Sequence, residues 1–340
     1  MYRYLRPLLF SLDPEAAHSL TINLLRIAGI TPGLRKIIQD AFKVPDKPLH
    51  AFGLRFKNPV GLAAGYDKDG IGWRGLALLG FGHIEIGTVT PKPQSGNPRP
   101  RMFRLIDEEA LINQLGFPGR GSRYVEKKIS SSHSREIILG VNLGKNAATP
   151  LNLATQDYQF LIQRFYGLAD YLVINISSPN TEGLRRLQVR QELAGLLESL
   201  VNICQKQEKE KKKKTPILIK ISPDLSQNEM RDGLDIIIEH GIEGIIAANT
   251  TISREVISSE YSNCSGGLSG KPLAYRNTEM IREIANYTKG KLPIIGVGGI
   301  MGSADARAKL EAGASLVQVY TGLVYRGPGL VKSILQELPD

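Results

Sequence analysis

Eight short apolar runs, rich in valine and isoleucine, recur along the chain from about residue 59 and alternate with stretches of helical periodicity. This alternation is typical of βα units, whose parallel strands are buried on both faces. The apolar runs are Pro59 to Ala64, His83 to Gly87, Ile137 to Asn142, Tyr171 to Ile176, Pro216 to Ile221, Gly244 to Asn249, Pro293 to Val297 and Ser315 to Tyr320. The helical stretches include Tyr158 to Leu168, Gln191 to Cys204, Glu229 to His240 and Thr278 to Tyr287. Eight such units close a (β/α)8 TIM barrel, and the sequence predicts that fold.

An open, doubly wound sheet is built from the same units and is the alternative fold. Its Gly-rich phosphate loop normally follows the first strand, whereas Gly296 to Gly299 follow the seventh apolar run here. The barrel is therefore favoured. Because a barrel takes roughly 250 residues, a chain of 340 residues has room for a small extension. We assign residues 1–45 to an N-terminal helical extension and residues 46–340 to the barrel.

The extension contains one clear helix. Asp13 and Pro14 form an N-cap and first-turn pair, and an apolar stripe then continues until Gly29. The preceding segment, Met1 to Leu12, mixes tyrosine and leucine with two arginines, which suits the interfacial zone of a bilayer. A plain helical cap on the bottom of the barrel explains these residues equally well.

Charge and cysteine content limit the possible partners. The formal charge of +10 fits nucleic acid, anionic lipid or an acidic metabolite, although part of it lies in one run that we interpret as a solvated loop: Lys206, Lys209, Lys211, Lys212, Lys213 and Lys214. The two cysteines have no spacing typical of a disulfide framework or a metal site, which fits a reducing cytoplasm. No uncharged apolar run reaches the roughly 20 residues that span a bilayer.

Polar residues follow the apolar runs, at the barrel end where reactive groups stand. Four of them are asparagines, Asn142, Asn175, Asn180 and Asn249. Neutral amides match the alternating N–H and C=O groups of a planar imide ring, which favours a nucleobase-like or flavin-like ligand. Any single asparagine can instead satisfy loop backbone.

Three further features point to an anionic ligand. Gly296 to Gly299 lead into a helix, and Thr321 with the next glycine follows the eighth run, a pattern typical of a barrel phosphate site. Lys220 ends a buried strand, where it can stabilise negative charge on a reduced flavin or reach out to solvent at the rim. Lys68 is either an anion contact or a surface lysine.

The segment Asn175 to Thr181 contains no histidine or cysteine that would serve as a base. The pKa of a serine hydroxyl is too high for it to accept a proton unaided, so a basic Ser178 needs a relay that begins at Thr181 or a water molecule. A turn with polar caps is the alternative interpretation.

Taken together, these motifs closely resemble the dihydroorotate dehydrogenases along nearly the whole chain. The resemblance rests on Ala63 to Gly70, Ile86 to Pro91, Asn113 to Phe117, Asn175 to Thr181, Gly266 to Gly270 and Gly296 to Gly299. It implies an FMN site formed by Ala64, Gly65, Tyr66, Asp67, Lys68, Thr88, Asn142, Asn175, Lys220, Ala248, Gly270, Gly299, Tyr320 and Thr321. It implies substrate contacts at Lys68, Asn113, Gln114, Leu115, Gly116, Phe117, Asn175, Asn180, Asn249 and Thr250. Ala248 stands where the family has threonine, which matters little if the contact uses the backbone.

The family divides by catalytic base, and this chain resembles the quinone-linked class. Soluble members have cysteine in the catalytic loop, whereas quinone-linked members have serine and an N-terminal helical extension. Ser178 would thus remove a proton from C5 of dihydroorotate while hydride leaves C6 for the flavin, with Phe117 and Thr181 shaping the relay. Quinone would enter between the N-terminal helices, where His18 and Arg104 match residues of the family's tunnel; a lone histidine on a helix is also commonly a surface residue.

The resemblance further implies a monomeric, peripheral protein on the cytoplasmic face of the cell membrane, without an iron–sulfur partner subunit, a metal or nucleic acid. Two alternative functions fit parts of the sequence. Dihydrouridine synthases are basic FMN barrels that act on uracil in RNA, but they use a catalytic cysteine and an RNA-binding domain, and neither is evident here. A basic phosphate-binding module without catalysis leaves the asparagines and the Ser178 segment unexplained.

Overall fold

The computed structural model describes residues 2–130, 137–255, 257 and 260–339. Its centre is a closed barrel of eight parallel strands, in the order β10-β12-β13-β3-β4-β7-β8-β9, with β9 paired to β10. These strands are β3 (Val60–Leu62), β4 (His83–Val89), β7 (Ile138–Leu143), β8 (Tyr171–Asn175), β9 (Ile217–Lys220), β10 (Gly244–Ala247), β12 (Ile294–Val297) and β13 (Leu316–Val319). Each predicted apolar run overlaps one of them, so the TIM barrel is confirmed and the open sheet is wrong.

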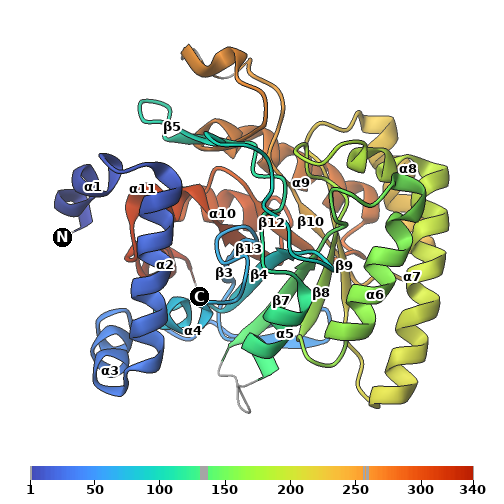
Figure 1. The fold of residues 1–340 in the computed structure, drawn as a ribbon, viewed down its shortest axis with the longest axis horizontal. Coiled ribbons are helices and arrows are strands. Elements are labelled where there is room, and N and C mark those ends of the chain that lie inside the picture. Colours follow the sequence, from blue (N-terminus) through green and yellow to red (C-terminus); the bar gives the residue numbers. More distant parts are fainter. Residues whose placement is uncertain (1, 131–136, 256, 258–259, 340) are drawn as a thin grey trace.

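Helices surround the strands on the outside of the barrel (Figure 1). They are α4 (Trp73–Ala77), α5 (Ser122–Ser130), α6 (Ala154–Phe165), α7 (Arg190–Lys211), α8 (Gln227–Glu239), α9 (Ala274–Thr288), α10 (Ser303–Glu311), α11 (Thr321–Arg326) and α12 (Leu330–Glu337), with 3-10 turns at Leu151–Leu153, Leu184–Gln188, Glu260–Asn263 and Lys271–Leu273. The apolar stripe of each long helix packs on the strands; in α7 it comprises Leu193, Leu196, Leu197 and Leu200. The four predicted helices overlap α6, α7, α8 and α9 and are confirmed.

The lysine run corrects one prediction. Helix α7 continues through Lys211, so Lys206 and Lys209 lie in its last turns rather than in a loop. Lysine, glutamate and glutamine are good helix formers, and lysines interact favourably with the carboxyl end of a helix. The helix ends at Lys212, which has a φ of 52°, and Lys214 forms an ion pair with Glu243 (Nζ to Oε1, 2.9 Å).

A short antiparallel hairpin covers the amino end of the barrel. Strands β1 (Leu49–Ala51) and β2 (Leu54–Phe56) pair with each other, and Phe56 is fully buried among the lower interior residues of the barrel. The ring of Phe52 lies against Gly244, where an added Cβ would come within 2.2 Å of it. Glycine at the start of β10 thus allows the hairpin to close over the barrel floor.

The carboxyl end carries a second small sheet that the sequence analysis did not predict. Strands β5 (Met102–Leu105), β6 (Ala110–Asn113) and β11 (Gly267–Gly270) form it in the order β11-β6-β5. Two loops far apart in sequence meet there, and β5 lies above the barrel strands in Figure 1. The sheet therefore brings Asn113 next to Gly267 at the mouth of the barrel.

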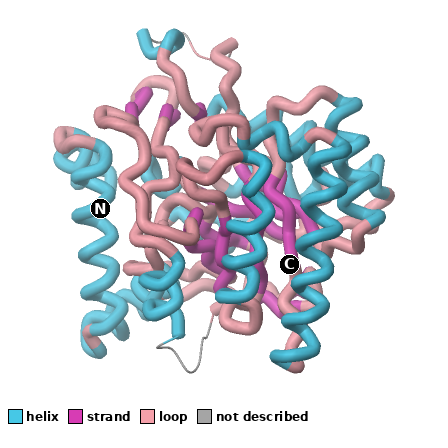
Figure 2. Tube along the Cα trace, turned by 45° about the vertical axis from the view of Figure 1, so that its right-hand side comes forward, coloured by secondary structure: helices cyan, strands magenta, loops and turns pink. Residues whose placement is uncertain are grey.

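The extension consists of three helices, α1 (Tyr2–Phe10), α2 (Pro14–Ile30) and α3 (Pro32–Ala41), at one side of the barrel (Figures 1 and 2). The predicted N-cap is confirmed, since Asp13 Oδ1 accepts hydrogen bonds from the backbone N–H groups of Glu15 and Ala16 (3.0 Å each). Helix α2 packs closely on α4, where a Cβ on Gly75 would come within 1.9 Å of the Leu25 carbonyl. The helices thus flank the barrel, and the interpretation as a cap on its bottom is wrong.

Candidate active site

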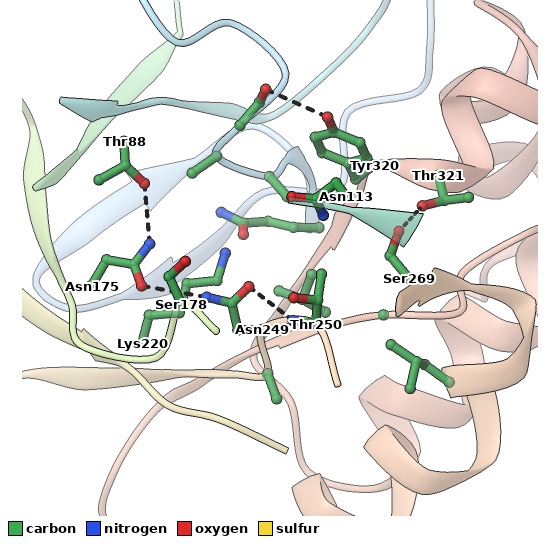
Figure 3. Close-up of a pocket in the computed structure, with 18 of the residues that line it drawn as sticks. Thr88, Asn113, Asn175, Ser178, Lys220, Asn249, Thr250, Ser269, Tyr320 and Thr321 are labelled. Carbon is green, nitrogen blue, oxygen red and sulfur yellow. Dashed lines mark hydrogen bonds between the residues drawn. The ribbon is translucent and has the colours of Figure 1, made fainter. Parts of the chain in front are cut away.

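Many polar side chains line a cavity at the carboxyl ends of the barrel strands (Figure 3). Counted with its open mouth, the cavity has a volume of about 990 Å³. Its wall contains Ala63, Ala64, Gly65, Lys68, Thr88, Asn113, Leu115, Gly116, Phe117, Asn175, Ser178, Asn180, Lys220, Ala248, Asn249, Thr250, Ser269, Gly270, Leu273, Val297, Gly298, Gly299, Ile300, Gln318, Val319, Tyr320, Thr321 and Gly322. Seven of the eight predicted strand ends thus contribute residues to one site, and the third, β7, supplies Asn142 behind the wall.

Three of the four asparagines, Asn142, Asn175 and Asn249, form one connected chain of hydrogen bonds. Asn175 Nδ2 donates to Asn142 Oδ1 (3.0 Å) and to Thr88 Oγ1 (3.1 Å), and Asn249 Nδ2 donates to Asn175 Oδ1 (3.3 Å). Asn249 Oδ1 accepts the backbone N–H of Thr250 (2.8 Å). The amides are therefore held by one another in fixed orientations and are not used to cap loop backbone alone.

Lys220 is buried at the end of β9, with its side chain directed into the same space as Ser178 and Asn249 (Figure 3). Burial lowers the pKa of Lys220, while the Glu85 carboxylate acts in the opposite direction. In its protonated form, a lysine in a poorly solvated site stabilises negative charge on a bound ligand strongly.

A second lysine, Lys68, lies on the opposite loop, and its Nζ donates to the Gly65 carbonyl (2.7 Å). Burial lowers the pKa of Lys68 to about 8, against the attraction of Glu15 and Asp69. Both lysines line the cavity, so the interpretation of Lys68 as a free surface lysine is wrong.

Ser178 is buried in the wall, on the loop after β8. Its Oγ accepts the backbone N–H of Asn180 (3.2 Å), and Asn180 Nδ2 in turn donates to Asn113 Oδ1 (3.0 Å). Opposite this loop, Phe117 is held with a φ of 54°, and its carbonyl accepts a hydrogen bond from Gln94 Nε2 (3.1 Å). None of the described residues that line the cavity is a histidine or a cysteine.

The loops after β12 and β13 form the glycine-rich part of the wall. Gly298 and Gly299 have φ values of 103° and 74°, a region of backbone conformation that favours glycine. A Cβ on Gly299 would lie 2.2 Å from the Ala274 backbone nitrogen. Across the cavity end, the hydroxyls of Ser269 and Thr321 are hydrogen-bonded (2.9 Å). The predicted phosphate site is thus a close-packed backbone cradle with hydroxyl groups at its edge.

Four residues expected at the site from the resemblance lie outside the cavity wall. Tyr66 faces a neighbouring cavity, and the Asp67 carboxylate accepts the N–H groups of Ile71 and Gly72 (2.8 Å each). Gln114 Nε2 donates to the Ser265 carbonyl (2.8 Å), and Asn142 lies behind Thr88 and Asn175. The other expected residues of the FMN and substrate sets line the cavity.

Sequence reasoning missed two polar residues, Gln318 in the cavity wall and Glu85 beneath it. Both are completely buried inside the barrel, and Gln318 Nε2 donates to Glu85 Oε2 (2.8 Å). Side chains of a strand alternate between its two faces, so the inward positions of β4 are His83 and Glu85. Both residues could have been predicted from the sequence, because each is a polar residue at an inward position of a predicted barrel strand.

The neighbouring cavity, of about 1320 Å³ with its open mouth, lies between the extension and the barrel. Its wall is mainly apolar and includes residues of all three extension helices. His18 and Arg104 line it; the His18 ring meets the Tyr66 ring edge to face (centroids 5.1 Å apart), and Arg104 Nη1 donates to the carbonyls of Phe10 and Leu12 (3.1 and 2.8 Å). Burial, and secondarily Lys68, lowers the pKa of His18 to about 3. Tyr320 lines both cavities.

Two negative findings concern only the part of the chain that the structure describes. Within it, no helix combines the length and the hydrophobicity needed to cross a membrane. In the same described residues, no cluster of three or more histidine, cysteine, aspartate or glutamate side chains has the arrangement of a metal site.

Comparisons with known proteins agree on one family. The family model described as dihydroorotate dehydrogenase matches residues 49–340. A dihydroorotate dehydrogenase (quinone) of Christiangramia forsetii is 48% identical over 99% of this chain and 98% of its own length, and one of Paraburkholderia phymatum is 48% identical over 99% and 97%. The crystal structure of the Eimeria tenella enzyme in complex with ferulenol superposes with a TM-score of 0.87 at 37% identity, covering 96% of this chain and 90% of that one. The chain belongs to the quinone-dependent dihydroorotate dehydrogenases.

Proposed function

We propose that this protein oxidises dihydroorotate to orotate, a step of de novo UMP synthesis, with FMN in the barrel cavity and a membrane quinone as final electron acceptor. One observation carries the proposal: Ser178, Lys220 and the linked amides of Asn175 and Asn249 line a single cavity. An imide ring needs alternating donors and acceptors, which the amides supply, and an anionic ring system needs the buried cation.

The residues present fit FMN. The close-packed glycines after β12 and the hydroxyls of Ser269 and Thr321 suit a phosphate, and Lys220 with Thr88 and Asn175 suits the polar edge of an isoalloxazine. Lys220 would stabilise negative charge on that edge, and Asn142 would hold Asn175 from behind. When bound, FMN supplies the acceptor for the hydride that leaves C6 of dihydroorotate. Ala248 stands where the family has threonine. If FMN contacts the backbone of Ala248, the threonine side chain is not needed.

Dihydroorotate is a carboxylate with an imide ring, and the remaining wall offers groups for both parts. Asn113 and Asn249 present amides, and Thr250 presents a hydroxyl, to the cavity (Figure 3). Asn180 adds a further amide to the wall. Lys68 supplies the nearby positive charge for the carboxylate. The backbone of Leu115 and Gly116 covers the bound ring, while Gln114 supports this loop from behind through its bond to Ser265.

Ser178 removes the proton from C5 of the substrate. Its Oγ accepts rather than donates in its bond with Asn180 N–H, so the hydroxyl hydrogen remains available for a second partner. When Ser178 passes its hydroxyl proton to that partner, its Oγ becomes basic enough to accept the proton from C5. A serine without such a partner is too weak a base. Thr181, buried three residues along the loop, begins this relay, and Phe117 shields it from bulk water.

The second cavity accepts the quinone. Its mainly apolar wall suits a quinone ring and tail, and His18 and Arg104 add polar groups to this wall. We assign residues 1–45 to this quinone-binding and membrane-binding extension and residues 46–340 to the catalytic barrel. Tyr320 lines both cavities, which supports a quinone site next to the flavin site.

The extension also presents the bilayer contact. All three of its helices expose large apolar side chains and carry arginine. The exposed apolar residues are Tyr4, Leu5, Leu8, Leu20, Leu24, Ile27, Ile30, Leu34 and Ile37. Exposed apolar surface of this kind next to cations is typical of helices that lie in the interface of an anionic membrane. This surface supports peripheral binding to the cytoplasmic face of the cell membrane. The resemblance to the family is what supports a monomer without an iron–sulfur subunit or nucleic acid.

An anaerobic titration tests the proposal. Dihydroorotate should bleach the flavin absorption of the purified protein, and a soluble quinone should restore it. Failure of dihydroorotate to bleach the flavin, or reoxidation that requires RNA, would refute the proposed reaction.

A further inference from the structure

Glu85 is a completely buried carboxylate on β4, beneath the floor of the active-site cavity. Each group that hydrogen-bonds to it is a donor: Asn142 Nδ2 to Oε1 (2.8 Å), Gln318 Nε2 to Oε2 (2.8 Å) and the Tyr171 hydroxyl to Oε2 (3.4 Å). Glu85 therefore acts on its neighbours only as an acceptor.

The hydrogen bonds above Glu85 all run in one direction. Asn142 turns its Nδ2 to Glu85 and its Oδ1 to Asn175; Asn175 turns its Nδ2 to Asn142 and its Oδ1 to Asn249. Asn249 turns its Nδ2 to Asn175 and its Oδ1 to the N–H of Thr250. Every amide thus has its donor side toward the carboxylate and its acceptor side toward the substrate end of the cavity.

We propose that Glu85 is a positioning residue that fixes the orientation of the asparagine amides presented to the substrate. An asparagine amide has nearly the same shape when turned by 180°, so packing alone does not choose between the two orientations. A carboxylate does choose, because a turned Asn142 would bring its carbonyl oxygen against an acceptor. The same orientation continues through Asn175 and Asn249, whose amide oxygens also accept the backbone N–H groups of Ser177 (3.3 Å) and Thr250 (2.8 Å). The inference rests on the proposed function, since it concerns the substrate that these amides bind.

Gln318 provides a way to separate orientation from charge. Its Oε1 is buried and has no hydrogen-bond partner among the described residues. In Glu85→Gln, the new amide can turn its carbonyl to Asn142 and its NH₂ to a turned Gln318, so an acceptor for Asn142 is retained. Glu85→Met has similar length but offers no comparable acceptor. Tyr171→Phe is the matched control, because it removes one bond to Glu85 and leaves the amide chain intact.

The experiment measures the dissociation constant of orotate from the change in flavin absorption of each variant, together with its flavin content and unfolding midpoint. Glu85→Met should weaken orotate binding by about tenfold or more, as expected when a polar site presents a misoriented group to its ligand. Glu85→Gln and Tyr171→Phe should stay within about threefold of the wild-type value. If Glu85→Met does not fold, Glu85→Asp replaces it, because its shortened carboxylate cannot reach Asn142; it should weaken binding by about fivefold or more.

Equal orotate affinity in the wild type and in Glu85→Met or Glu85→Asp would overturn the inference. Equal losses in Glu85→Gln and Glu85→Met would also overturn it, because the negative charge and not the amide orientation would then matter. In either case a wild-type flavin that is still bleached by dihydroorotate leaves the proposed function intact. A wild type that neither binds orotate nor reacts with dihydroorotate would refute both.

Discussion

The ring of Tyr320 meets the ring of Tyr66 edge to face, with centroids 5.7 Å apart and planes inclined by 75°. Tyr320 belongs to the wall of both cavities, and Tyr66 extends the contact to His18 at 5.1 Å. One aromatic partition thus separates a polar chamber from an apolar one. In the proposed reaction, dihydroorotate is oxidised on one side of this partition and quinone is reduced on the other.

Replacing Ser178 by alanine should slow the bleaching of the flavin by dihydroorotate about 10²-fold or more, because the proton acceptor at C5 is lost. Orotate should still bind, since the amides and Lys68 remain. Stopped-flow absorption and an orotate titration measure the two quantities. Ser177→Ala is the control, although Ser177 also bonds Asn249, so it should affect orotate affinity rather than the bleaching rate at saturation. Unchanged bleaching in Ser178→Ala would remove Ser178 from its role.

Lys220→Met should make the two-electron reduction potential of the bound flavin more negative, because a buried cation next to the reduced ring is lost. A shift of about 30 mV corresponds to about 1.4 kcal/mol for two electrons. Redox titration against indicator dyes measures it. Lys127→Met removes an exposed lysine on α5 and should leave the potential unchanged. A potential that is equally unchanged in Lys220→Met would contradict the assigned contact.

Arg104→Met should raise the KM for quinone by about fivefold to tenfold while leaving flavin reduction by dihydroorotate unaltered. Arg104 holds the carbonyls of Phe10 and Leu12, and its guanidinium lies 4.8 Å from the Phe10 ring centroid, so its loss loosens α1 over the cavity; two such bonds contribute about 1 to 3 kcal/mol. Steady-state kinetics with a short-chain quinone measure the effect. Arg231→Met on α8, where the arginine stacks on Tyr287, serves as control. Parallel losses in both half-reactions would indicate a general structural defect.

The exposed apolar face of the extension should govern binding to lipid. Leu8 and Ile37 are 68% and 67% exposed, and changing both to serine removes apolar area without disturbing the cavity wall. Flotation with vesicles that contain anionic lipid should recover several-fold less protein, because burial of each large apolar side chain contributes about 1.5 to 3 kcal/mol. Tyr275→Ser changes a residue that is 77% exposed on α9 and should float like the wild type. Equal flotation of all three proteins would place the lipid contact elsewhere.

His83 should make the protein sensitive to mild acid. It is fully buried, neither ring nitrogen has a hydrogen-bond partner among the described residues, and burial lowers its pKa to about 3. The unfolded chain takes up a proton on this histidine below about pH 6.5, whereas the folded protein does not. His83 therefore adds no pH dependence to the free energy of unfolding above pH 6.5, and it lowers this free energy by about 1.4 kcal/mol per pH unit as the pH falls from 6.5 toward 3.

Urea unfolding at pH 7, 6 and 5 checks this contribution. His83→Leu should unfold at pH 7 with a free energy equal to that of the wild type or about 1 kcal/mol higher, because it removes two unsatisfied polar atoms. Its free energy of unfolding should fall less steeply with acid. Identical slopes in both proteins would show that His83 is not the sensitive group.

The barrel could be predicted because its strands are buried on both faces and therefore appear as continuous apolar runs. Ser178 and the asparagines could be found because they follow those runs directly. The small sheet of β5, β6 and β11 could not, since its strands are three short segments from distant loops whose pairing depends on the barrel beneath them. Glu85 was missed for a related reason: its function depends on Asn142 and Gln318, which come from other strands and meet it only inside the closed barrel.

The hairpin of β1 and β2 makes the amino end of the barrel suitable for attaching a label, whereas the carboxyl end holds the active-site cavity. Arg55 is exposed on this hairpin, at the end remote from both chambers. A fluorophore attached through Arg55→Cys would stand clear of substrate, quinone and lipid alike. Such a label would report how the enzyme tumbles on a vesicle while turnover continues undisturbed.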